Sequence, residues 1–350
     1  MKERIKKLVV LFSVCALALG AVTGCGSGNN EAATETQKTE AENTAGNEAA
    51  EAETTENETE ESEVTEEATE ASYKDAVEEL VICYLPNEAS DEYAEERSDL
   101  QDSLAEVLGI KVTEINVSDY NAVVEAMRTG QADIAYYGPV SYVQAAERAN
   151  AEVMVVAARE GKKENAGYTS KFIVRADSDI QTLEDLKGKS FAFVDPSSTS
   201  GNYVPTLELM NTFEGLTNDD LHTNGAFFES VIFSGKHQNG LQSVLNGDVD
   251  AAPISSDTLA AEIAGGRANE ADLRVIHESA TIPGSPFAIR GDLPEDLKAT
   301  VKEFFLNYDN EEYFVQMLGA DEGDGTKFVE AYDSDYDYVR ELMEKVIPEE

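Results

Sequence analysis

Hydrophobic positions along the chain fall into short runs that alternate with amphipathic stretches. The Val-Ile-Cys-Tyr-Leu run at 81–85 predicts a buried strand, and apolar side chains at helical spacing over 91–108, stopped by Gly109, predict a helix. Further strands are expected at 111–117, 133–137, 153–157, 171–175, 190–194, 230–233, 249–252 and 274–277, most of them followed by a helical pattern. This alternation predicts an α/β protein with parallel sheets covered by helices.

The first 25 residues read as an export signal. Basic residues in 2–7 precede an apolar run from Leu8 to Val22, and Thr23-Gly24-Cys25 follows. This order is typical of a secretory signal, and the run is short for a membrane-spanning helix, the alternative. A cysteine directly after small residues resembles the bacterial lipobox, in which the signal is cleaved and the cysteine becomes a diacylated N-terminus. Cys25 is therefore the expected lipidation site, holding the protein on the extracytoplasmic face of the cell membrane.

Residues 26–72 have the composition of a tether. They contain 15 glutamates, one lysine and almost nothing large and apolar, so we expect a disordered acidic spacer. The whole chain of 350 residues has a net charge of −44, which argues against nucleic-acid binding and against docking on anionic lipid through surface charge. Three cysteines (15, 25 and 83) exclude a disulfide framework and a CxxC-based zinc or redox site. We expect neither a metal nor a cofactor.

A loop rich in hydroxyl groups gives the strongest chemical signal. Ser197-Ser198-Thr199-Ser200-Gly201 lies between a predicted strand and a predicted helix. A helix start offers free N–H groups and about half a positive charge, which suits a phosphate-like anion. Plain N-capping would account for only one of the serines, so the residues alone leave both interpretations open.

Other polar side chains also follow predicted strands. Tyr136 and Tyr137 end one strand and should point in opposite directions, so one of them is expected to pack in the core. Tyr120 at a helix start is equally ambiguous between packing and binding. His237 follows a strand and a glycine, where a ring nitrogen could donate to an oxyanion. Asp257 is a surface carboxylate or an acceptor beside the anion site.

Taken together and in order, these segments resemble the phosphate/phosphite/phosphonate-binding subunits of ABC importers, the PhnD type of periplasmic binding protein. The resemblance spans 73–350 and rests on Ser118-Asp119-Tyr120, 133–138, 195–201, Gly235-Lys236-His237, 249–252 and Ile282-Pro283-Gly284. It implies a type II periplasmic-binding-protein fold, with two α/β lobes joined by two crossing segments and a ligand cleft between them. Lobe 1 would comprise 73–177 and 279–350, and lobe 2 would comprise 178–278.

The resemblance also implies the ligand-binding residues: Tyr120, Tyr137, Ser198, Thr199, Ser200 and His237, with Asp257 in a second acidic position. The protein would be a monomer that captures a phosphorus oxyanion by hinge closure and delivers it to a permease and its ATPase. Aminoalkylphosphonate binders of this family have an acid after Ile-Pro-Gly, where this chain has Ser285. That departure favours phosphite, methylphosphonate or phosphate.

Two other classes of function are weighed against this one. A serine hydrolase is disfavoured because no G-x-S-x-G elbow occurs, so the protein is not expected to be an enzyme. A ligand-sensing accessory lipoprotein without a transport role is the second alternative, and it would share every feature above except the permease.

Overall fold

The computed structural model describes residues 72–347. The predicted signal peptide at 1–25, with Cys25, and the predicted tether apart from Ser72 lie outside the described residues. In the described part of the chain, no helix is long and apolar enough to cross a bilayer.

Lobe 1 is built on a six-stranded sheet with the order β13-β4-β12-β3-β1-β2. Its strands are β1 (Glu79–Cys83), β2 (Lys111–Ile115), β3 (Ile134–Tyr136), β4 (Ala151–Ala158), β12 (Pro286–Arg290) and β13 (Lys327–Glu330). β1 runs parallel to β2 and β3, whereas β12 is antiparallel to β3 and β4, and β13 is antiparallel to β4. The expectation of parallel sheets therefore holds for β1, β2 and β3 and is wrong for β12 and β13, and in lobe 2 also for Ser170–Arg175, which pairs antiparallel with both its neighbours.

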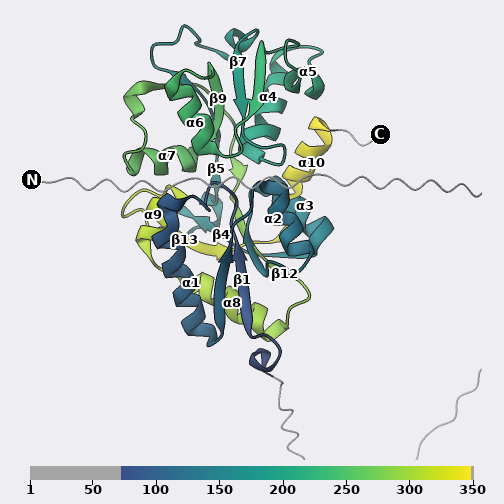
Figure 1. Cartoon of the computed structure of the whole chain (residues 1–350), viewed down its shortest axis with the longest axis vertical. Coiled ribbons are helices and arrows are strands. Elements are labelled where there is room, and N and C mark those ends of the chain that lie inside the picture. Colours follow the sequence, from purple (N-terminus) through teal and green to yellow (C-terminus); the bar gives the residue numbers. More distant parts are fainter. Residues whose placement is uncertain (1–71, 348–350) are drawn as a thin grey trace, which may run out of the picture. The chain divides into compact units, whose positions relative to one another are not determined.

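Helices cover both faces of this sheet (Figure 1). One face carries α1 (Ala94–Leu108), α8 (Glu295–Asn307) and α9 (Glu311–Leu318), and the other carries α2 (Tyr120–Arg128), α3 (Pro139–Ala149) and α10 (Asp337–Val346). In α1, fully buried leucines recur every fourth residue, at 100, 104 and 108, so a single stripe of that helix faces the sheet. Pro139 at the first position of α3 suits a helix start, because proline lacks the N–H that would be unpaired there.

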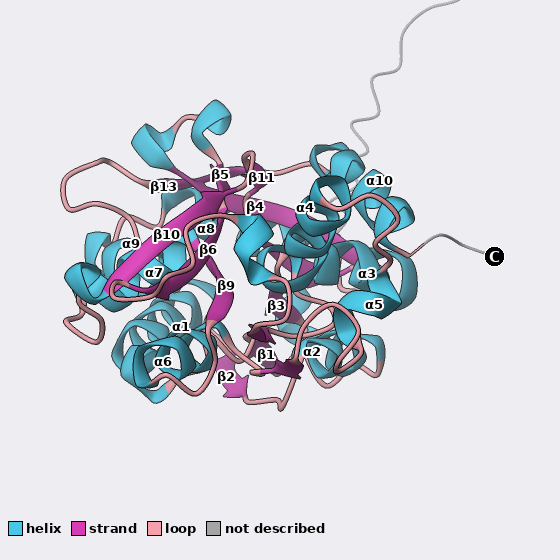
Figure 2. Cartoon of the chain, turned by 90° about the horizontal axis from the view of Figure 1, so that it is seen from above, coloured by secondary structure: helices cyan, strands magenta, loops and turns pink. Residues whose placement is uncertain are grey.

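Lobe 2 is built on a five-stranded sheet with the order β10-β6-β9-β7-β8. Its strands are β6 (Ser170–Arg175), β7 (Ser190–Phe193), β8 (Ser230–Phe233), β9 (Ala251–Ser255) and β10 (Leu273–Glu278). Core residues from α4 (Val204–Thr212) and α5 (Asn218–His222) pack on one side, and those from α6 (His237–Asn246) and α7 (Ser256–Ala264) on the other (Figure 2).

Two short strands join the lobes. β5 (Gly167–Tyr168) and β11 (Ile282–Pro283) pair antiparallel as a separate ribbon between the two sheets. Immediately after β5, strand β6 pairs with β9 and β10, so residues 170–177 belong to lobe 2 and the predicted boundary after 177 lies too late. The apolar run at 171–175 predicts a strand but carries no information on which sheet the strand joins.

Candidate functional site

The hydroxyl-rich loop lies at the interface between the lobes, directly after β7. It folds as a π-helical turn (Thr199–Tyr203) that leads into α4, and Ser198 Oγ accepts a 3.0 Å hydrogen bond from the Gly201 N–H. Gly201 is required by space, because a Cβ there would lie 2.4 Å from the Val194 side chain. The loop is therefore held against the end of β7 with the serine and threonine side chains buried.

Thr199 reaches across to lobe 1. Its Oγ1 accepts a 2.8 Å hydrogen bond from the Val140 N–H, at the second residue of α3. The first N–H groups of a helix have no partner within the helix and carry its positive end, so this is a position that favours an oxyanion. A lobe 2 hydroxyl thus meets that helix start, and we call the form in which the lobes contact each other in this way the closed form.

Asn87 connects the two lobes through a pair of hydrogen bonds. Its Nδ2 donates to the Tyr120 hydroxyl at 2.6 Å, and its Oδ1 accepts from the His237 backbone N–H at 2.9 Å. Tyr120 is the first residue of α2, whose N-cap is Asp119, and burial raises its pKa well above the usual range. The phenol is therefore neutral, and Ser198 lies close enough to act on its pKa.

Asp195 also links the lobes at this point. One carboxylate oxygen accepts from the Ser197 N–H at 2.8 Å, and the other lies 3.4 Å from the Tyr120 N–H at the start of α2. Burial is the main cause of its raised pKa, which the two N–H groups partly oppose. A lobe 2 carboxylate thus faces one lobe 1 helix start, while Thr199 faces another.

His237 is a buried neutral donor. The Ser255 N–H donates to Nδ1 at 3.2 Å, which leaves Nε2 to carry the ring proton, and Nε2 lies 3.3 Å from Ser200 Oγ. Burial lowers the pKa of His237 to about 3. In a serine hydrolase the histidine Nε2 accepts the serine proton and Nδ1 donates to a carboxylate, so this arrangement has the opposite polarity.

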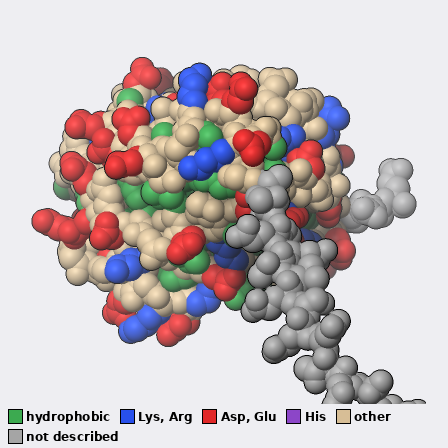
Figure 3. All heavy atoms as spheres, turned by 90° about the horizontal axis from the view of Figure 1, so that it is seen from below, with side chains coloured by type: hydrophobic (Ala, Val, Ile, Leu, Met, Phe, Trp, Pro, Cys, Tyr) green, Lys and Arg blue, Asp and Glu red, His purple; other side chains and the backbone are tan. Residues whose placement is uncertain are grey.

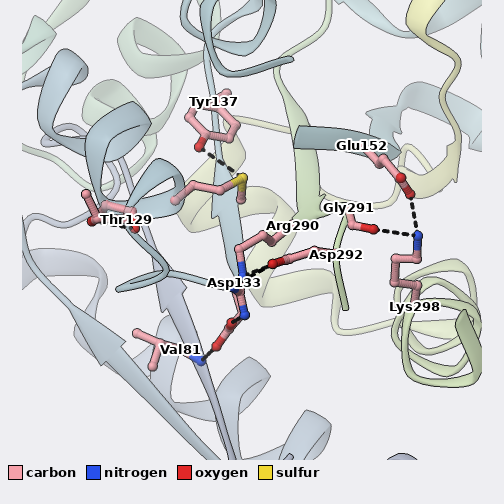
Figure 4. A network of polar contacts seen from close by, with 11 residues as sticks. Val81, Thr129, Asp133, Tyr137, Glu152, Arg290, Gly291, Asp292 and Lys298 are labelled. Atoms are coloured by element: carbon pink, nitrogen blue, oxygen red, sulfur yellow. Dashed lines mark hydrogen bonds and ion pairs between the residues drawn. The ribbon is translucent and has the colours of Figure 1, made fainter. Parts of the chain in front are cut away.

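The tyrosines divide differently from the sequence prediction. Figure 4 shows the Tyr137 hydroxyl directed to a sulfur atom, which is Met127 Sδ at 3.6 Å, and the side chain is fully buried in the core of lobe 1. The prediction of Tyr137 as a cleft residue therefore disagrees with its position. Tyr136 points the other way, where burial and the carboxylates of Glu88 and Asp257 raise its pKa.

Tyr168 in β5 was not predicted, yet its phenol lies beside the hydroxyl-rich loop. Burial raises its pKa, and the hydroxyls of Ser200, Ser285 and Thr199 lower it. In the sequence, a tyrosine directly after Gly167 in a polar connecting segment was the feature that could have pointed to Tyr168. Asn87 was missed as well, although it obeys the rule applied elsewhere: it is a polar residue just beyond the carboxyl end of a parallel strand.

Asp257, from α7 of lobe 2, lies beside a lobe 1 arginine. Its Oδ1 is 3.5 Å from Arg159 Nη2, and both border a cavity of about 30 Å³ next to β5. Burial raises the pKa of Asp257 to about 6, and Arg159 opposes that shift. Asp257 therefore has a cationic partner from lobe 1.

The site thus brings Tyr120, Ser198, Thr199, Ser200 and His237 together and adds Asn87 and Tyr168. Its donors are hydroxyls, a neutral imidazole and backbone N–H groups. Acidic side chains outnumber basic ones on the face that Figure 3 shows, in line with the net charge of −44. Within residues 72–347, no cluster of three His, Cys, Asp or Glu side chains could hold a metal ion.

Known proteins are similar to this chain in sequence and in fold. Residues 82–336 match the family described as the periplasmic substrate-binding protein of the phosphonate ABC transporter. The chain is 31% identical over 278 residues to the phosphate-import protein PhnD of Mycolicibacterium smegmatis, covering 76% of this chain and 85% of that protein. It is 34% identical to the phosphonates-binding periplasmic protein of Escherichia coli, over 60% of each chain.

A solved structure extends the similarity to the fold. PhnD1 from Prochlorococcus marinus, in complex with methylphosphonate, superimposes with a TM-score of 0.65 at 21% identity, covering 77% of this chain and 98% of that one.

Proposed function

The chain belongs to the periplasmic phosphonate-binding proteins of ABC transporters, and from this premise we propose how it captures its ligand. The protein has the type II periplasmic-binding-protein fold and is the substrate-binding component of an importer, with a permease and an ATPase as partners. We propose that a phosphorus oxyanion binds between the lobes and that hinge bending at β5 and β11 closes them over it.

The observation that carries this proposal is the contact between Thr199 and the start of α3. The Thr199 hydroxyl of lobe 2 accepts a hydrogen bond from the Val140 N–H of lobe 1, at the position where a helix start favours an anion. An oxyanion inserted there would accept from the α3 N–H groups and from the serine and threonine hydroxyls at once. It would therefore bind the closed form better than the open one, and that difference in affinity drives closure.

We propose that the ligand contacts are made by hydroxyls, an imidazole and backbone N–H groups. Tyr168 takes the place predicted for Tyr137, and the full set is Tyr120, Tyr168, Ser198, Thr199, Ser200 and His237. Hydrogen bonds to a charged group contribute roughly 1.5–3 kcal/mol each. Five or six of them support binding of about −8 kcal/mol, near micromolar, after the costs of closure and ordering.

We propose the kind of oxyanion from the two positions where an amine of the ligand would be bound, Ser285 and Asp257. Ser285 stands where an acid would bind an amine, and Asp257 is already paired with Arg159. We therefore propose phosphite, methylphosphonate or phosphate as the ligand. The relatives' names span this range, since they include a phosphate importer and a structure with methylphosphonate.

Anchoring and assembly complete the proposal. We propose that Cys25 is lipidated, so that a monomer is held on the outer face of the membrane beside its permease. The alternative role, a sensing lipoprotein that does not serve transport, predicts that deleting the cognate permease leaves uptake of the ligand unchanged.

A thermal-shift panel with the full-length chain tests the proposal. Phosphate, phosphite, methylphosphonate, ethylphosphonate and 2-aminoethylphosphonate are compared, and one of the first four should raise the Tm most. Thr199→Val and His237→Ala should each abolish the shift, whereas Tyr137→Phe, in the core of lobe 1, should retain it. A panel in which nothing stabilises the protein contradicts the proposed function, and one in which 2-aminoethylphosphonate prevails contradicts the choice of ligand.

A further inference from the structure

Glu88 is an acid at the lobe interface that none of the assigned contacts uses. It follows β1 and is the neighbour of Asn87, and its backbone carbonyl is held by Arg97 Nη1 at 2.7 Å. The Oε2 atom of Glu88 is enclosed and has no hydrogen-bond partner. A buried carboxylate oxygen without a partner is costly, so this atom is a place where a ligand could supply the missing contact.

The side chains around Glu88 include some of those that surround the proposed ligand. The charge of Glu88 raises the pKa of the Tyr120 phenol and of the Tyr136 phenol, so the carboxylate lies near both. The charge of Asp257 in lobe 2 raises the pKa of Glu88 in turn, so the two carboxylates are close to each other. Glu88 therefore borders the same group of side chains as the hydroxyl-rich loop, from the opposite lobe.

Nearby cations do not neutralise Glu88. Arg97 directs Nε to Glu114 at 2.8 Å and Nη1 to the carbonyl oxygens of Glu88 and Ser90. Arg159 pairs with Asp257, Lys236 of lobe 2 donates from Nζ to Ser90 Oγ at 2.6 Å, and His237 is neutral. Within the described residues, 72–347, no lysine or arginine forms an ion pair with the Glu88 carboxylate.

An anionic ligand and an ionised carboxylate cannot share this interface unless a proton lies between them. Given the oxyanion site of the proposed function, on which this inference rests, we propose that Glu88 shares one proton with a phosphorus-bound oxygen of the ligand. The proton either enters on Glu88 as the lobes close or arrives on the ligand as a P–OH group. In both cases the closed complex binds one proton between Glu88 and the ligand, and a complex without the Glu88 carboxylate would lack that proton.

The acid–base properties of Glu88 agree with this role. Burial raises its pKa to about 8 in the closed form and Asp257 adds to that shift, while its own backbone N–H, the Asn87 side chain and Arg97 oppose it. In the open form the side chain would be solvated and ionised at neutral pH, with a pKa of about 4.3. Closure at pH 7 therefore takes up a proton, and an oxyanion beside the carboxylate strengthens the uptake.

Calorimetric titration at pH 7 in two buffers of different ionisation enthalpy tests this inference. The full-length chain, Glu88→Gln and Glu92→Gln are titrated with methylphosphonate, phosphite and inorganic phosphate. Glu92 is an exposed acid close by in the sequence and is the matched control. Because the ligand's own titration is the same for every variant, the wild type and Glu88→Gln should differ in uptake by about one proton per ligand bound. Glu92→Gln should behave as the wild type.

The pH profile gives a second readout. Relative to Glu88→Gln, the Kd of the wild type should rise by up to about tenfold per pH unit between pH 5 and 8. The glutamine amide can still donate a hydrogen bond, so this variant should bind and unfold with a cooperative transition.

Three results would overturn the inference: equal proton uptake in both proteins, complete loss of binding in folded Glu88→Gln, or a preference for 2-aminoethylphosphonate that this substitution removes. The last result would mean an ionised Glu88 that pairs with an amine. If no phosphorus oxyanion binds the wild type, it is the proposed function that fails, and the two failures are thereby distinguished.

Discussion

The Tyr93 hydroxyl of lobe 1 donates a 2.9 Å hydrogen bond to Oε1 of Glu262 in lobe 2. The same oxygen accepts from Arg267 Nε at 2.9 Å, and the Arg267 guanidinium lies 5.2 Å from the centre of the Tyr93 ring. Glu262 is only 2% exposed. This contact joins the lobes without involving the proposed ligand residues, so it stabilises the closed form even when the cleft is empty.

Tyr93→Phe should therefore weaken ligand binding from outside the site. The substitution keeps the ring over Arg267 but removes the hydroxyl that donates to the buried Glu262 carboxylate. A hydrogen bond to a charged group contributes roughly 1.5–3 kcal/mol of stability. We expect a Kd about tenfold or more higher and a smaller closed fraction without ligand, measured by calorimetry and by fluorescence transfer between labelled lobes. Tyr338→Phe, on an exposed face, is the control. An unchanged closed fraction would mean that the Tyr93 contact does not affect closure.

Gly319 offers a way to block closure sterically. It ends α9 with φ of 69°, and a Cβ there would lie 2.1 Å from the Asp257 carbonyl oxygen of lobe 2. Gly319→Ala should raise the Kd more than tenfold, because the clash exists only when the lobes meet. Gly323→Ala is a matched control, since Gly323 also has a positive φ of 79° but no atom within 4 Å of the added Cβ. Equal Kd values for the two variants would contradict the steric explanation.

The two tyrosines separate a cleft role from a core role. Tyr168→Phe should raise the Kd by about tenfold or more, the effect of losing a hydrogen bond to a charged ligand. Tyr137→Phe should leave the Kd within about twofold, because its hydroxyl contacts Met127 and not the cleft. Calorimetric titration of both variants with the same ligand measures the difference. The reverse order of effects would restore Tyr137 to the site.

His237 makes stability depend on pH in a defined direction. Its pKa is about 3 in the folded protein against an ordinary value of 6.5, so between these values only the unfolded chain binds the proton. The free energy of unfolding should fall as pH drops below 6.5, by up to about 1.4 kcal/mol per pH unit. Glu88 acts oppositely, because its raised pKa adds stability at low pH that is lost as pH rises toward 8.

His237→Gln should consequently lose less Tm than the wild type between pH 6.5 and 4.5, as followed by circular dichroism. Identical slopes in wild type and His237→Gln would indicate that His237 is not buried and neutral in solution.

Local features of the sequence identified most of the candidate residues. A serine-rich loop between a strand and a helix, a tyrosine at a helix start and a histidine after a strand and a glycine were each candidates from their neighbouring residues, and the family resemblance then favoured binding over capping or packing. In the structure these side chains converge at the lobe interface. Local sequence carries this information because a parallel strand places its carboxyl end, and whatever follows it, at one edge of the sheet.

The tertiary structure alone decided which residues face the cleft. Tyr136 and Tyr137 are equivalent in the sequence, and only the packing of β3 and α2 directs the Tyr137 hydroxyl into the core. Asn87 meets His237 although 150 residues separate them, because closure brings their lobes together. Composition and spacing determined the class, the order of the elements and the position of the hydroxyl-rich loop between a strand and a helix. The direction in which each side chain points, and the residues that it contacts, depend on long-range contacts that no local pattern encodes.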